Sequence, residues 1–217
     1  MRPARIEALS DGIFAIVMTL LILELKVPIL HSSPVTSLSL LDALSHLWPK
    51  FLSYLTSFVI LAIYWLSHHI QFGYVARTNF NHVWMNLVFL LFVTFIPFST
   101  AFLGEYPTSV LAHFIYGLNL IACGCALYVS WHYAITENRL TEPHSISKVL
   151  EINARHKILL PPAIYFVAMV TSLVSPILSL IIFALGPILY FVPIDSHTWN
   201  FLIIKSPINH AKIIEVD

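Results

Sequence analysis

Four long stretches without a charged residue restrict what this chain can fold into. They cover residues 51–76, 78–104, 106–136 and 158–194. A transmembrane helix needs about 20 consecutive, mainly apolar residues, so each of the first three stretches is long enough for one span. The last stretch is too long for one span and contains Pro176 near its middle, so we expect a hairpin of two helices there. Together with an apolar opening helix, the sequence predicts an all-α integral membrane protein with six transmembrane helices.

The composition supports a membrane protein. Only 10% of the 217 residues are charged, whereas soluble domains have about 25%. The formal net charge is zero, which argues against a nucleic-acid partner, because such partners require a basic face. We expect one domain over residues 1–217, with helices near 5–27, 49–75, 80–104, 108–135, 157–174 and 177–194.

The distribution of lysine and arginine predicts the orientation in the membrane. With six spans, one side holds nine of the 11 basic residues, and basic loops remain on the cytoplasmic side. These nine are Arg2, Arg5, Arg77, Arg139, Lys148, Arg155, Lys157, Lys205 and Lys212. We therefore expect a multi-pass protein of the cell membrane with both termini in the cytoplasm. The outer 28–48 segment is either a plain loop or contains a short interfacial helix from about Leu38 to Trp48.

The opening helix, "RIEALSDGIFAIVMTLLILEL", has a polar first half and an apolar second half. At about 100° per residue, its apolar face forms one stripe, and Ser10 and Asp11 lie on the far side. The stripe consists of Gly12, Ile16, Thr19, Leu20 and Leu23. Periodicity alone favours the plain interpretation that this stripe contacts lipid or packs against another helix.

Asp11 is unusual for a membrane helix, because a charged group in a span costs roughly 2.5–3.5 kcal/mol and normally has a partner or a function. Polar partners are available near the same membrane face in "YWLSHHIQF", with His68 and His69, and in "NFNHVWMNL", with Asn86. A hydrogen-bond network between these helices would hold the opening helix in place. The sequence does not decide which histidine takes part.

The opening segment resembles the signature of the transmembrane protein 175 family of potassium channels, which has an Arg, three residues, then Phe-Ser-Asp and an apolar run. Here Arg5 is followed by Leu9, Ser10 and Asp11, so leucine replaces the phenylalanine. The segments "WLSHH", Asn86-Leu87 and Pro97-Phe98 are also similar to the family's second and third helices. The resemblance covers the first hundred residues well, whereas the later helices match mainly in number and length.

This resemblance implies a homotetramer around a central pore lined by the opening helix. Ile16 would be the constricting residue, Leu20 and Leu23 would form further apolar layers, and Thr19 would add a hydroxyl layer. Arg5, Ser10 and Asp11 would belong to a supporting network with His68 or His69 and Asn86. The expected partners are other copies of the chain, the lipid bilayer and monovalent cations.

The function implied by the resemblance is passive potassium conduction. The chain has no "TVGYG" loop, the segment whose carbonyl oxygens replace the ion's hydration shell in other potassium channels, so selectivity would come from the apolar rings. We expect no enzymatic activity and no cofactor besides the permeant K⁺ ion. The alternatives are a proton- or cation-coupled transporter, suggested by 11 histidines and a membrane aspartate, a histidine-box enzyme suggested by "SHH", and a structural membrane protein.

Overall fold

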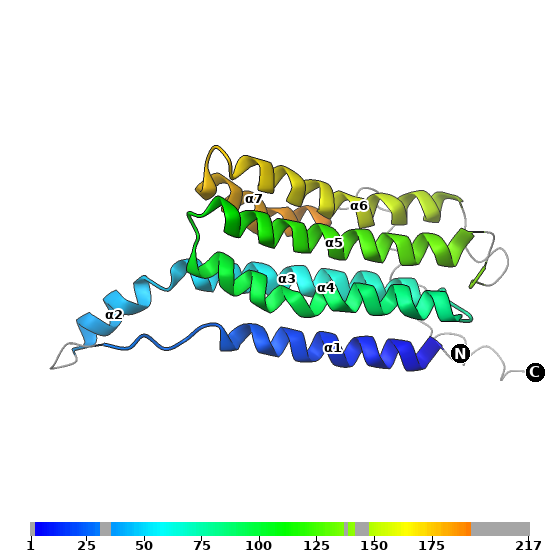
Figure 1. Ribbon diagram of the computed structural model, residues 1–217, viewed down its shortest axis with the longest axis horizontal. Coiled ribbons are helices and arrows are strands. Elements are labelled where there is room, and N and C mark those ends of the chain that lie inside the picture. The colour runs from blue at the N-terminus through cyan, green and yellow to red at the C-terminus, as the bar shows by residue number, and fades with distance from the viewer. Residues whose placement is uncertain (1–2, 31–35, 137–138, 142–147, 192–217) are drawn as a thin grey trace, which may run out of the picture.

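The computed structural model describes residues 3–30, 36–136, 139–141 and 148–191, and the secondary structure of this part is helical apart from one isolated β-bridge (Figure 1). The helices are α1 (Pro3–Leu23), α2 (Ser37–Ser45), α3 (Trp48–Phe72), α4 (Phe80–Glu105), α5 (Val110–Ile135), α6 (Lys148–Thr171) and α7 (Pro176–Phe191). Within the described ranges, α1, α3, α4 and α5 are long and apolar enough to cross a membrane. Shorter apolar helical segments lie at Ile158–Thr171 and Pro176–Ile188. The all-α prediction is confirmed, and the six crossings stay a prediction.

Five long helices form a closed bundle, and α1 lies beside it. Helices α3 to α7 pack in chain order, and α7 returns to pack against α3. Helix α1 packs against α3 and α4, and Figure 1 shows it along one side of the bundle. This arrangement leaves much of α1 outside the bundle.

Aromatic and aliphatic side chains from most of the long helices fill the bundle interior. Fully buried examples are Phe14, Phe89, Tyr116, Tyr165 and Phe183. Helices α5 and α6 approach closely at Gly124. The approach is so close that a Cβ on Gly124 would collide with the ring of Pro162. Glycine at this position is therefore required by the packing.

The largest differences from the expected helix boundaries are at two places. Helix α1 ends at Leu23 instead of continuing to residue 27. Pro28 disfavours helical backbone at residue 27, and within a helix its ring would clash with the carbonyl of residue 24. Helix α6 begins at Lys148 instead of near residue 157. The charged segment before residue 158 has no proline or glycine and extends the helix, whereas charge-free stretches identify only its apolar part.

Helix α2 accounts for part of the 28–48 segment. It starts at an N-cap where the Thr36 hydroxyl accepts a hydrogen bond from the Ser39 amide. Figure 1 shows α2 beyond the ends of the long helices. The expectations for Arg2, Lys205, Lys212, residues 192–194 and most of the 137–147 loop lie outside the described residues.

Candidate functional site

Helix α1 has one buried face and one exposed face. The buried face points toward α3 and α4 and consists of Ile6, Ser10, Phe14, Val17 and Leu21. On the opposite face, Ile16, Leu20 and Leu23 expose 59%, 42% and 66% of their surface. Three large apolar side chains at helical spacing thus stand on a surface that the single chain does not cover.

Thr19 and Gly12 belong to the same exposed face. The Thr19 hydroxyl donates a hydrogen bond to the Ile16 carbonyl oxygen, 2.8 Å away, so its proton is used within α1. The hydroxyl oxygen of this exposed residue also has lone pairs that can accept hydrogen bonds. A Cβ on Gly12 would have no atom of another residue within 4 Å, so the backbone is open there.

A buried hydrogen-bond chain attaches α1 to α3 and α4. The Asn86 side-chain amide donates to the Ser10 hydroxyl oxygen at 3.1 Å, and its carbonyl oxygen lies 2.8 Å from His68 Nε2. Because this carbonyl oxygen can only accept, His68 Nε2 carries the proton. The Ser10 hydroxyl in turn donates to the Ile6 carbonyl oxygen at 3.0 Å. Ser10, His68 and Asn86 are all buried, so this chain is shielded from solvent.

Aromatic rings enclose this buried chain. The His68 ring stacks on Phe72 and on Phe89, with centroid distances of 4.3 and 5.7 Å. Phe14 of α1 packs against His68 and Phe89 at 6.4 and 6.0 Å. Apolar rings around a hydrogen-bond chain lower the local dielectric, which strengthens the bonds and increases the cost of breaking one.

A second pair of contacts joins α1 to α3 on the exposed side. Trp65 Nε1 donates to Asp11 Oδ1 at 2.8 Å, and His69 Nδ1 lies 3.1 Å from Glu7 Oε1. Each helix contributes two residues one turn apart, and the Trp65 and His69 rings stack with a centroid distance of 5.6 Å. These two contacts form a two-rung clamp, by which we mean the Glu7–His69 and Asp11–Trp65 pairs.

The structure separates the residues that we expected in one network. His68 joins Ser10 and Asn86 inside the bundle, whereas His69 reaches Glu7 on the surface. Arg5 is exposed, and within the described part of the chain it makes no hydrogen bond or ion pair with this network. Glu7 and Trp65 were missing from the expected set.

Two features of the site bear on its chemistry. Within the described ranges, no three His, Cys, Asp or Glu side chains come together as a group that could hold a metal ion. The exposed apolar face of α1 could line a water-filled or dewetted passage where copies of α1 meet, because its opposite face is fixed to its own bundle.

Known proteins resemble this chain in sequence. A family model described as "Endosomal/lysosomal potassium channel TMEM175" matches residues 5–97. A protein of Chamaesiphon minutus, named as a potassium channel, is 38% identical over 179 residues, which cover 81% of this chain and 86% of that protein. A protein of a Chryseobacterium species, also named as a potassium channel, is 30% identical over a match that covers 89% of this chain and 94% of that protein. The chicken "endosomal/lysosomal proton channel TMEM175" is 37% identical over 47% of this chain but only 21% of its own length.

A solved structure also resembles this chain. It is described as the crystal structure of a lysosomal potassium-selective channel TMEM175 homolog from Chamaesiphon minutus. The TM-score is 0.74 with 34% sequence identity, and the match covers 87% of this chain and 95% of the other. Likeness of fold therefore extends over nearly the whole of both chains.

Proposed function

The chain belongs to the TMEM175 family, and we propose that it forms a potassium-permeable cation channel whose pore is lined by α1. The single observation that carries this proposal is the exposed apolar stripe of α1, opposite a face that buried hydrogen bonds fix to α3 and α4. The names of the bacterial relatives support potassium as the permeant ion. We expect a transport protein of the cell membrane without enzymatic activity.

The pore requires more than one copy of the chain. One copy leaves Ile16, Leu20 and Leu23 exposed, and four copies of α1 around an axis would bring these residues together as rings. We propose a homotetramer with six crossings per subunit and both termini in the cytoplasm. The orientation is supported by the excess of lysine and arginine on that side of the predicted topology.

Apolar rings would select ions through the cost of dehydration. An ion that passes the Ile16 ring sheds part of its water, and K⁺ holds its water less tightly than Na⁺, so the barrier is lower for K⁺. The lone pairs of the exposed Thr19 hydroxyl would offer partial compensation just beyond the constriction. Such a filter discriminates modestly, and it uses no cofactor besides the permeant ion.

The buried chain and the two-rung clamp would hold the pore helix against its own subunit. Ser10, His68 and Asn86 fix the rotation of α1 from inside, and the clamp fixes it from outside. A rotation of α1 by one residue would turn Ile16 away from the axis. Rigid attachment of α1 is therefore needed for a defined constriction.

The test is passive K⁺ and Na⁺ flux into liposomes that contain the purified protein, with Ile16→Asn beside the wild type. We expect K⁺ to be favoured, and we expect Ile16→Asn to raise the flux of both ions and reduce the preference. Ile181→Asn is the matched control, since Ile181 is also an exposed isoleucine, with 46% of its surface accessible against 59% for Ile16, but lies on α7. If Ile16→Asn leaves the flux unchanged, the pore lies elsewhere. If the flux requires a pH gradient, a proton-coupled transporter is favoured.

A further inference from the structure

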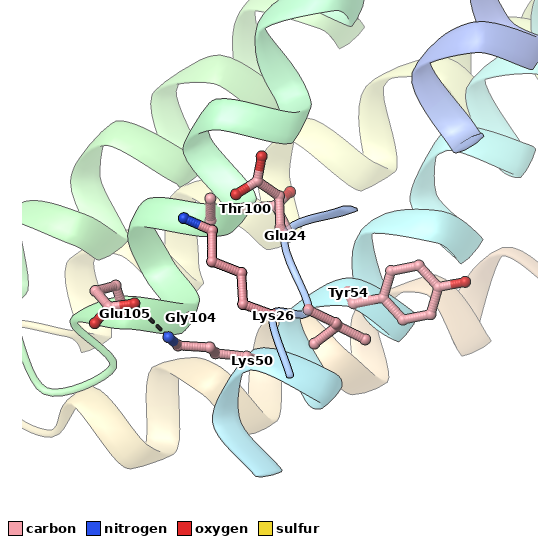
Figure 2. Close-up of a pocket in the computed structure, with 9 residues that line it drawn as sticks. Glu24, Lys26, Lys50, Tyr54, Thr100, Gly104 and Glu105 are labelled. Atoms are coloured by element: carbon pink, nitrogen blue, oxygen red, sulfur yellow. Dashed lines mark ion pairs between the residues drawn. The ribbon is translucent and has the colours of Figure 1, made fainter. Parts of the chain in front are cut away.

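A small charged cavity lies at the end of the bundle opposite the N-terminus. Its volume is about 70 Å³, and it is enclosed by the segment after α1, the start of α3 and the end of α4 (Figure 2). Four charged residues line it: Glu24, Lys26, Lys50 and Glu105. In the described part of the chain, Asp42 of α2 is the other charged residue at this end, so the charges are concentrated at one place.

Two of the four charges neutralise each other. Lys50 forms an ion pair with Glu105, shown dashed in Figure 2. Gly104 lets α4 approach α3 closely beside this pair, because a Cβ there would lie only 3.1 Å from the Lys50 Cα.

The other two charges lack a partner among the described residues. Neither the Glu24 carboxylate nor the Lys26 ammonium forms an ion pair or side-chain hydrogen bond within that part of the chain. The cavity therefore presents one negative and one positive side chain that no ion pair joins to each other or to another described residue. A ligand that matches both must itself carry a positive and a negative group.

An apolar strip runs from this cavity along α3. Tyr54 lines the cavity, and its ring packs against Phe51 and Phe58, each at a centroid distance of 6.3 Å. Phe51, Leu55 and Phe58 are exposed. A charged cavity that continues into an exposed aromatic strip has the form of a site for an amphipathic molecule.

We propose that this cavity binds the headgroup of a phospholipid that joins a phosphate to a primary ammonium. Lys26 contacts the phosphate, Glu24 accepts hydrogen bonds from the ammonium, and an acyl chain lies along Phe51, Leu55 and Phe58. A trimethylammonium headgroup has no N–H to donate to Glu24, and a purely anionic headgroup leaves Glu24 uncompensated. The site is independent of which helix lines the pore.

The experiment is native mass spectrometry of the full-length protein in detergent, titrated with phosphatidylethanolamine, phosphatidylcholine or phosphatidylglycerol. We expect phosphatidylethanolamine to bind on the order of ten- to a hundredfold more tightly than the other two, as one added charge-assisted hydrogen bond implies. Glu24→Gln should remove this preference, and Lys26→Gln should weaken binding of all three lipids. Asp42→Asn is the matched control, and it should change nothing.

A series of ligands tests the same contact without mutation. Stepwise N-methylation of phosphatidylethanolamine removes its N–H donors one at a time, so affinity for the wild type should fall along the series. Equal affinity for all members, or a preference that survives Glu24→Gln, would overturn the proposal. Binding of soluble phosphoethanolamine without any binding of the lipid would also overturn it and assign the cavity to a free zwitterion.

Discussion

Asn86 of α4 donates a hydrogen bond to Ser10 of α1 at 3.1 Å, although the two residues are 76 positions apart in the sequence. The same amide reaches His68 of α3, so one side chain connects three helices inside the bundle. Helix α1 packs mainly on α3 and α4, and this amide is the polar centre of that contact. Its loss should therefore affect the attachment of α1 more than the rest of the bundle.

Replacement of Asn86 by leucine tests this attachment. In Asn86→Leu, the buried His68 Nε2–H loses its acceptor and Ser10 loses its donor. A buried polar group without a partner costs about 1–3 kcal/mol, so we expect a lower midpoint of thermal unfolding in detergent. An unchanged midpoint would mean that water replaces the missing amide.

The two-rung clamp should contribute less than the buried chain. Trp65→Phe removes the donor to Asp11 and keeps an aromatic ring stacked near His69. Because this contact is exposed, we expect a loss of at most about 1 kcal/mol in the free energy of unfolding. The measurement is the free energy of unfolding of Trp65→Phe and Asn86→Leu in the same detergent. A larger loss for Trp65→Phe would mean that the clamp contributes more than the buried chain.

The sequence predicted the helices and the faces of α1, and it could not predict the pairing of the histidines. Charge-free stretches identify membrane helices because charges are costly in lipid, and helical spacing separates Ser10 from Ile16. His68 and His69 are neighbours about 100° apart on one helix, so one must face inward and one outward. Which of them faces inward depends on how α3 is rotated against α1 and α4, and that rotation is set by packing over the whole bundle.

Glu7 and Trp65 were missed for a related reason. The i, i+4 spacing of Glu7 and Asp11, matched by Trp65 and His69, was visible in the sequence as a pattern on each helix. Whether the two patterns meet depends on the relative height of the helices, that is, on how far α1 is shifted along its axis against α3. In the structure, Phe14 packs against both His68 and Phe89, and this contact, which the sequence does not specify, accompanies the observed height of α1.

Two glycines should respond in opposite ways to alanine. Gly104→Ala places a Cβ 3.1 Å from the Lys50 Cα, so α3 and α4 must shift apart by a few tenths of an ångström, and we expect a loss of about 1 kcal/mol. Gly12→Ala meets no neighbour and removes a flexible residue from a helix, so we expect a gain of about 0.5–1 kcal/mol. Thermal unfolding of both variants checks the signs, and equal signs would contradict the packing described for Gly104.

Cysteine accessibility should map the proposed pore face. In a Cys125→Ser background, which removes the exposed native thiol, a charged water-soluble thiol reagent should reduce K⁺ flux through Ile16→Cys and Leu23→Cys. Cys123 is buried and should not interfere. Ile181→Cys on α7 is the control, since Ile181 is exposed away from the proposed pore face, where a side chain that faces lipid would stay inaccessible to a charged reagent. Equal modification of all three positions would argue against a pore at α1.

The hydroxyl of Thr19 allows a closely controlled test of the proposed pore face, because another exposed threonine of the chain has nearly the same hydrogen bonding. Thr19 and Thr94 are both exposed, and each donates at 2.8 Å to the carbonyl oxygen three residues earlier in its own helix. Replacement of either by valine, which has nearly the same shape, should change the free energy of unfolding equally and by less than about 0.5 kcal/mol. Only Thr19 faces the proposed axis, where its lone pairs would ease the dehydration of K⁺ beyond Ile16. We therefore expect a severalfold lower K⁺ flux in liposomes for Thr19→Val and wild-type flux for Thr94→Val, whereas equal fluxes for the two variants would remove the hydroxyl layer from the mechanism.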